Sequence, residues 1–156
     1  MIYKLYTDGA TSNNGYEGAY GGYGWAIIAN DKLVEDGSGY ICPATNNICE
    51  LIGMIEGCEA AQFFADPFEE VLVYSDSAYI INCYKQRWYE NWERNGWINS
   101  KKQPVANKEL WEELIPFFEN PNFKFEKVKG HSIDKWNNYV DRLAVEAKIN
   151  GKNNNC

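Results

Sequence analysis

The segment Val71-Leu72-Val73-Tyr74-Ser75-Asp76-Ser77 is the most informative part of this sequence. Its four apolar residues form a continuous run, which favours a strand covered on both faces. The Ser-Asp-Ser triplet that follows contains helix-capping residues, so a helix is expected to begin there. A buried strand that leads directly into a helix is typical of α/β folds with parallel strands.

The sequence on either side of this segment alternates between strand and helix patterns. The Asn30-Asp31 pair predicts a hairpin turn, and Thr45 with two asparagines predicts the start of a long helix packed against a sheet. The Gly- and Asn-rich residues 13–24 are typical of a loop or a bulged hairpin. The expected strands are 2–7, 23–29, 33–41, 71–74 and 123–128, and the expected helices after the first are roughly 85–96, 107–118 and 136–149.

This order of elements predicts an α/β fold with a mixed five-stranded sheet and helices on both faces. The early hairpins indicate three antiparallel strands, and the later alternation of strand and helix indicates parallel strands. No internal repeat or linker divides the chain. We therefore expect one domain over residues 1–150 and a flexible tail at 151–156.

The composition of the 156 residues, 45% hydrophobic and 24% charged, is ordinary for one globular domain. No segment approaches the roughly 20 apolar residues of a membrane span, and the start of the chain is too short and too polar for a signal peptide. A cytoplasmic monomer without membrane contact or an obligate protein partner is the default expectation. Five cysteines without CxxC spacing indicate buried free thiols rather than a disulfide framework or a zinc site.

The charge of the chain is distributed unevenly. The formal net charge is −7, yet residues 85–108 hold six basic residues against two acidic ones, so this segment carries +4 and the remainder −11. The net charge alone argues against a nucleic-acid partner. A local basic patch on an acidic body nevertheless provides one surface to which a polyanion can bind.

Four acidic residues stand out, although each has an ordinary interpretation alone. Asp8 could form a turn before Gly9, and Glu50 could stabilise the first turn of a helix. Asp76 could be a helix N-cap, and Asp141 could lie on a solvated helix face. Asp8 and Asp76, however, both follow expected strands, and ligands gather at the carboxyl ends of the strands in such sheets. Glu50, at a helix start, can point to the same edge.

Carboxylates gathered in this way repel one another and need a compensating cation. Oxygen ligands with little histidine or cysteine suit Mg²⁺ or Mn²⁺ rather than zinc. Four carboxylates are enough to hold two ions about 3.5–4 Å apart, which is the geometry of two-metal phosphodiester cleavage.

The same residues lie in motifs that resemble those of the type-1 ribonuclease H family, from Ile2 to about Lys148. The motifs are Tyr6-Thr7-Asp8-Gly9, Thr45-Asn46-Asn47-Ile48-Cys49-Glu50-Leu51, Tyr74-Ser75-Asp76-Ser77, Val128-Lys129-Gly130-His131, and Asn137 followed by Asp141. The resemblance implies a ribonuclease H-like fold. It also implies an endonuclease that hydrolyses the RNA strand of RNA–DNA hybrids with two Mg²⁺ ions, or Mn²⁺ in their place, and leaves 5′-phosphate and 3′-hydroxyl ends.

The resemblance also implies a role for each catalytic residue. Asp8 would bridge both metal ions, and Asp141 would help to bind the ion that activates the attacking water. Glu50 and Asp76 would hold the second ion, next to the departing 3′ oxygen. His131 matches the family's mobile histidine, which assists proton transfer or release of product and metal, and its ordinary interpretation is a surface-loop histidine.

Substrate contacts follow from the resemblance as well, although asparagines in turns and caps have a structural explanation too. The implied contacts are Asn14, Asn46 and Asn47 in the minor groove, Thr45 and Asn107 at a DNA phosphate, and Trp88 at a DNA sugar. Trp88 belongs to a basic, aromatic protrusion at about 85–106, in which Trp92 is expected to form a small core. Pro43 stands where several relatives have arginine, so phosphate binding is expected to be weaker or to be achieved differently. Glu90 and Glu93 reduce the positive charge of the protrusion and predict looser hybrid binding without loss of catalysis.

Three alternatives have less support from the sequence. A catalytically silent nucleic-acid-binding module would lack one or more of the four carboxylates. A nuclease for DNA junctions or DNA duplexes would not explain the complete TNN-x-x-E motif together with the tryptophan-bearing protrusion. A protein-interaction domain would leave the carboxylate cluster unexplained.

Overall fold

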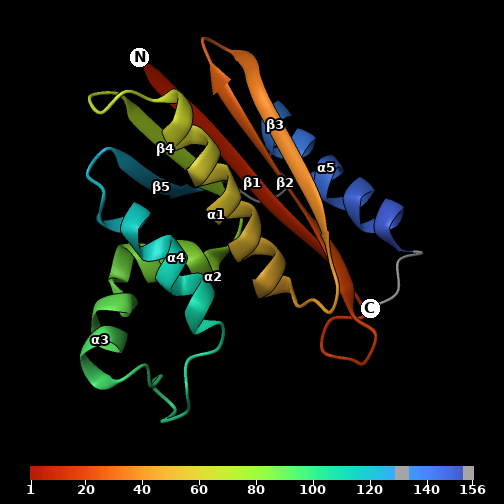
Figure 1. The fold of residues 1–156 in the computed structure, drawn as a ribbon, viewed down its shortest axis with the longest axis vertical. Coiled ribbons are helices and arrows are strands. Elements are labelled where there is room, and N and C mark those ends of the chain that lie inside the picture. The colour runs from red at the N-terminus through yellow and green to blue at the C-terminus, as the bar shows by residue number, and fades with distance from the viewer. Residues whose placement is uncertain (129–133, 153–156) are drawn as a thin grey trace.

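A mixed sheet with helices on both faces forms the centre of the computed structural model, which describes residues 1–128 and 134–152 (Figure 1). The strands are β1 (Ile2–Ser12), β2 (Tyr20–Ala29), β3 (Lys32–Ile41), β4 (Glu70–Ser75) and β5 (Phe123–Lys127), and the helices are α1 (Asn46–Phe64), α2 (Ala78–Gln86), α3 (Trp88–Asn95), α4 (Lys108–Glu119) and α5 (Lys135–Gly151). The strand order is β3-β2-β1-β4-β5. β1, β2 and β3 pair antiparallel, and β4 pairs parallel with β1 and β5. The expected fold class is confirmed.

The sheet separates two hydrophobic cores. Leu5 of β1 faces the larger core with α1, α2, α4 and residues of β4 and β5, whereas Tyr6 faces the smaller core with Val140 of α5. This alternation is the period of two expected for a strand buried on both faces. α5 packs across β1, β2 and β3, and α1 packs on the opposite face of β1 and β2. Helix packing on both faces therefore holds β1 at the centre of the molecule.

Two local predictions at turns and caps are confirmed. Asn30 and Asp31 both have positive φ values, 53° and 63°, as a two-residue hairpin turn with the right twist requires. Thr45 caps α1, because its side chain accepts a hydrogen bond from the backbone N–H of Ile48 at 3.1 Å. The second helix is capped by Ser77 rather than by Asp76, so the carboxylate of Asp76 is not used as a cap.

Two other local predictions were wrong. Residues 20–22, expected in a loop or a bulged hairpin, belong to β2, because their glycines allow a helix backbone to lie against the strand. A Cβ atom on Gly22 would stand 2.5 Å from the carbonyl oxygen of Ala144 in α5. Residues 85–96 were expected to form one helix, but Arg87 adopts a left-handed conformation, φ 57°, that ends α2 and starts α3.

The cysteines agree only in part with the sequence prediction. Cys49, Cys58 and Cys83 are buried free thiols, as expected. Cys42 is disulfide-bonded, so the prediction is wrong at this position. The physical reason is that spacing along the chain does not limit which cysteines meet in space. Within the described residues, no helix is long and apolar enough to cross a membrane.

The start of α5 is tied to the sheet by one carboxylate. Asp134 caps the helix, accepting hydrogen bonds from the backbone N–H groups of Trp136 at 2.9 Å and Asn137 at 3.4 Å. The Tyr6 hydroxyl donates a further hydrogen bond to Asp134 at 2.9 Å, and the Tyr6 ring stacks on Tyr74 with centroids 5.0 Å apart. Asp134 thereby links the N-terminus of α5 to the middle of β1.

We predict that Asp134→Ala lowers the free energy of unfolding by about 1–2 kcal/mol, because the cap and the partner of the Tyr6 hydroxyl are both lost. Urea unfolding followed by circular dichroism measures the change. Asp134→Asn is the matched control, since its side-chain oxygen can still cap the helix and should retain most of the stability. Equal losses in the two variants would show that the cap is not what Asp134 contributes.

Candidate active site

The register between β1 and β4 brings Asp8 and Asp76 together. Tyr6 and Tyr74 form the last pair of the parallel ladder, and each aspartate follows its tyrosine by two residues, Asp8 within β1 and Asp76 just after β4. The expectation that Asp8 ends its strand is wrong, because β1 continues to Ser12 and stays paired with β2. Asp8 nevertheless lies just beyond the end of the parallel pairing, where ligand sites form in such sheets.

Glu50 is brought to Asp8 by the close approach of α1 at Gly9. A Cβ atom on Gly9 would stand 2.9 Å from both the Cys49 Cβ and the Glu50 backbone nitrogen. The Gly9 N–H donates to Asp8 Oδ1 at 2.9 Å and to Glu50 Oε1 at 3.2 Å. The Asp8-Gly9 pair, interpreted from the sequence as a turn signal, is therefore part of a strand. Glycine is needed at position 9 because α1 packs directly against the strand backbone there.

Three carboxylates form a compact group at this point. Oxygen atoms of Asp8, Glu50 and Asp76 all lie within 4.8 Å of one another. Asp8 is 5% exposed, Glu50 is half-buried and Asp76 is exposed. Burial, and then the charge of Asp76, raises the pKa of Asp8 from 3.8 to about 7. Burial, and then the charges of Asp8 and Asp76, raises the pKa of Glu50 well above its ordinary value.

The group fits a divalent cation. Glu50 Oε2 is buried and has no hydrogen-bond partner among the described residues, which leaves one carboxylate oxygen available as a ligand. The donors are all carboxylate oxygens, which Mg²⁺ and Mn²⁺ prefer. A bound cation would also offset the repulsion that raises both pKa values.

Asp141 lies at the rim of this group rather than inside it. It is exposed on α5, and its negative charge contributes to the raised pKa of Asp8. Gly24 pairs with Asp8 across the β1–β2 ladder and allows the close approach of α5 at Val140, the neighbour of Asp141. The structure thus brings all four predicted carboxylates to one end of the sheet, three of them in close contact.

One further polar group near this site has no role assigned from the sequence. Asn137, one helical turn before Asp141 in α5, has a buried side-chain oxygen without a hydrogen-bond partner among the described residues. In the sequence, Asn137 stands out only as part of a motif. It lies three residues before Val140 and seven before Ala144, and this helical spacing to the buried residues of α5 is the signal that could have indicated its burial. His131 lies outside the described residues.

Five of the six residues expected to contact substrate line one hollow of about 460 Å³. It is lined by Asn14, Thr45, Asn46, Asn47, Ala106 and Asn107. The side-chain oxygen of Asn14 accepts a hydrogen bond from the Asn46 backbone N–H at 3.0 Å, so turn and cap chemistry positions these residues. The hollow lies at the N-terminus of α1, where backbone N–H groups favour an anion.

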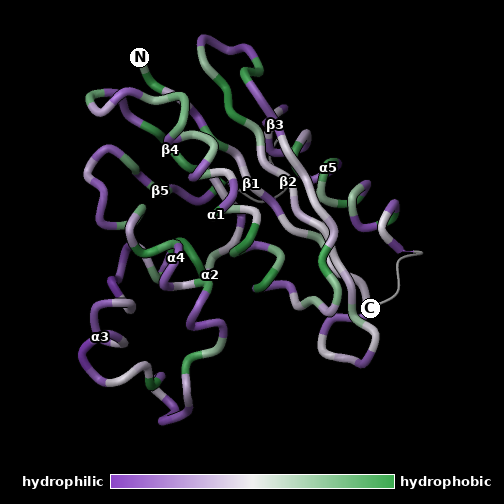
Figure 2. Tube along the Cα trace, in the orientation of Figure 1, coloured by the Kyte–Doolittle hydropathy of each residue, from purple (hydrophilic) through white to green (hydrophobic). Residues whose placement is uncertain are grey.

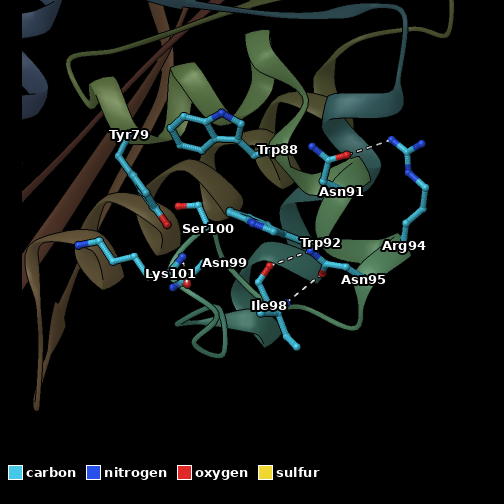
Figure 3. Close-up of a pocket in the computed structure, with 10 residues that line it drawn as sticks. All are labelled: Tyr79, Trp88, Asn91, Trp92, Arg94, Asn95, Ile98, Asn99, Ser100 and Lys101. Carbon is cyan, nitrogen blue, oxygen red and sulfur yellow. Dashed lines mark hydrogen bonds between the residues drawn. The ribbon is translucent and has the colours of Figure 1, made fainter.

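The sixth residue, Trp88, lines a larger pocket of about 790 Å³ formed by α3 and the segment after it (Figure 3). Its ring packs against Tyr79 with centroids 5.7 Å apart, and its indole N–H donates to Gln86 Oε1 at 3.1 Å. Trp92 is buried beneath it, 7% exposed, as the expected small core requires. Arg94 also lines the pocket, and the ribbon around α3 is largely hydrophilic (Figure 2).

Comparison with known sequences gives one consistent family. A family model described as RNase H matches residues 2–149. A protein named Ribonuclease H from Syntrophomonas wolfei is 44% identical over 143 residues, covering 92% of this chain and 93% of the relative. Ribonuclease H from Clostridium botulinum is 42% identical over 143 residues, with the same coverage of both chains.

Solved structures share the fold. The crystal structure of LC9-RNase H1, described as a type 1 RNase H with the type 2 active-site motif, has a TM-score of 0.78 at 27% identity. It covers 96% of this chain and 72% of that chain. The crystal structure of LC11-RNase H1 in complex with RNA/DNA hybrid has a TM-score of 0.69 at 24% identity and covers 96% and 98% of the two chains.

We predict that Asp8→Asn raises the free energy of unfolding of the metal-free protein above pH 7 by about 1–3 kcal/mol. Folding raises the Asp8 pKa from 3.8 to about 7. As the pH rises, Asp8 therefore ionises in the unfolded chain before it ionises in the folded protein. The free energy of unfolding falls between pH 3.8 and about pH 7 as a result. Near pH 3.8 the two proteins should be similar. Urea unfolding in the presence of a chelator, at both pH values, measures the difference.

Proposed function

This chain belongs to the ribonuclease H family, and we propose that it is a divalent-metal-dependent endonuclease which hydrolyses the RNA strand of RNA–DNA hybrids. One observation carries the proposal. Carboxylate oxygens from β1, α1 and the residue after β4 lie within 4.8 Å of one another, with Asp141 at the rim. The products would have 5′-phosphate and 3′-hydroxyl ends.

Mg²⁺ is the proposed ion, with Mn²⁺ as its substitute, because the site offers carboxylate oxygens only. Two such ions, when bound, would supply positive charge next to the scissile phosphate and acidify the attacking water. Asp8 would be a ligand to both. Asp141 would serve the ion on the side of the attacking water, and Glu50 and Asp76 the ion on the side of the departing 3′ oxygen.

The hollow beside the carboxylates supports substrate recognition. An enzyme that selects RNA must contact the 2′-hydroxyl, and we propose Asn14, Asn46 and Asn47 for minor-groove contacts. Thr45 and Asn107 line the same hollow and would bind a phosphate of the DNA strand. Trp88 would pack on a DNA sugar, and the basic residues around it would contact phosphates.

We also propose that residues 1–150 form the catalytic domain, with 85–106 as its nucleic-acid-binding protrusion and 151–156 as a tail. α5 extends one residue past this boundary, to Gly151. The protein would act as a monomer in the cytoplasm without an obligate partner.

The function is tested with labelled RNA–DNA hybrid, RNA duplex and DNA duplex, each with Mg²⁺, with Mn²⁺ and with a chelator. We expect cleavage of the RNA strand of the hybrid only, and only with metal. Asp8→Asn should lower the rate by about 10³-fold or more, because a ligand shared by both ions is lost. Asp31→Asn, in the remote hairpin turn, should leave it unchanged. An Asp8→Asn variant that cuts at the parent rate would exclude the proposal.

We predict that Asn107→Asp raises the KM for hybrid about tenfold, because a carboxylate in the hollow repels the DNA phosphate. The left-handed backbone of Asn107, φ 62°, accepts aspartate without added strain. Asn30→Asp is the matched control, since Asn30 also has a positive φ, 53°, and lies in the hairpin turn. If both substitutions change the KM equally, the hollow does not bind phosphate.

The proposed role of His131 is assistance to proton transfer or to release of product and metal. Its alanine variant should therefore turn over more slowly without being inactive. Steady-state and single-turnover rates on the hybrid distinguish the steps. Complete loss of activity would contradict an assisting role, and so would a steady-state rate equal to that of the parent.

A further inference from the structure

A groove of about 530 Å³ lies far from the carboxylate site, between the C-terminal half of α1 and strands β2 and β3. Two phenylalanines and three glutamates line it, together with Trp25. Neither the metal site nor the substrate-binding hollow includes any of these residues. The groove therefore has no role in the proposed hydrolysis.

Two of the aromatic side chains of this groove, the phenylalanines, are exposed to solvent, whereas Trp25 is buried. Phe63 is 91% exposed and Phe64 37% exposed, and their rings pack edge to face with centroids 6.4 Å apart. Glu56, Glu59 and Phe63 follow the i, i+3, i+7 spacing of one helix face. This face of α1 thus places an exposed aromatic surface beside carboxylates, and an exposed apolar patch with a polar rim is typical of an interaction site.

The charges of the groove are uncompensated. Glu35, Glu56 and Glu59 line it without any lysine or arginine, and none of the three forms an ion pair within the described part of the chain. Glu56 accepts a hydrogen bond from the Tyr23 hydroxyl, which is neutral. A ligand that complements this groove must carry positive charge beside apolar groups.

We propose that this groove binds a basic, apolar peptide segment of another protein. Its aliphatic or aromatic side chains would cover Phe63 and Phe64, and its lysines or arginines would pair with the three glutamates. Nucleic acids and the anionic surfaces of membranes are polyanions that the glutamates repel. A peptide with both features is the partner that the shape and the charge of the groove favour.

Such binding would leave the catalytic end of the molecule open. Glu50 and Phe63 lie on the same helix, 13 residues and therefore about 20 Å apart along its axis. The C-terminus of α1 and the protrusion around α3 lie at opposite ends of the molecule in Figure 1. A partner in the groove could therefore hold the protein near its substrates without competing with them. The inference does not depend on the proposed nuclease activity.

Fluorescence anisotropy with labelled synthetic peptides tests the proposal. A short Lys-Leu alternating peptide is expected to bind, whereas Lys-Ser and Glu-Leu peptides of equal length are not. Phe63→Ser and Glu59→Lys should each weaken binding about tenfold or more. Phe68→Ser is the matched control, because Phe68 is 96% exposed but does not line the groove. Amide chemical-shift changes should centre on residues 56–64 of α1.

Several outcomes would overturn the proposal. One is equal affinity of the Phe63→Ser and Phe68→Ser variants for the Lys-Leu peptide, and another is binding of the Lys-Ser peptide as tight as that of the Lys-Leu peptide. Binding to anionic phospholipid vesicles in place of the peptide, or a self-association that Phe63→Ser abolishes, would overturn it as well. The hybrid-cleavage rate is measured on the same variants. We expect all of them to cut at the parent rate, so a failed docking site and a failed nuclease assignment give different results.

Discussion

The close packing of two helices against the sheet at Gly9 and Gly24 is the contact on which the carboxylate site depends. At Gly9 the backbone of α1 lies so near β1 that no Cβ atom would fit, and this proximity brings Glu50 to Asp8. At Gly24, opposite Asp8 in the ladder, α5 approaches from the other face and brings Asp141 near. Because Gly9 and Gly24 lack side chains, the two helices can bring Glu50 and Asp141 close to Asp8.

This packing creates a conflict between stability and chemistry. Asp8 is nearly buried and Glu50 half-buried, and both carry raised pKa values because each is desolvated and close to other negative charges. A single backbone N–H, that of Gly9, donates to both. Such an arrangement is unfavourable in the isolated protein and favourable with a divalent cation, so ion binding would contribute to the stability of the fold.

Much of this organisation could be predicted from the sequence because it depends on local signals. The hydrophobic run at Val71–Tyr74, the Thr45 cap and the Asn30-Asp31 turn indicated the fold class and the edge at which the acidic residues meet. The errors arose where tertiary contacts override local preference. Asp8-Gly9 resembled a turn, and the glycines of residues 20–22 resembled a loop or a bulged hairpin, because the helices packed against them are not visible in the local sequence.

The position of Asp8 inside a continuous ladder has a consequence for how the site responds to its ligands. β1 stays paired with β2 on both sides of Asp8, from Lys4 to Ser12, so the main chain at this residue is held in place by neighbours in both directions. The main-chain conformational entropy of Asp8 is therefore lost when the protein folds and not when a metal ion binds. Asp8 is therefore a preorganised anchor, around which the exposed carboxylates of Asp76 and Asp141 can adjust.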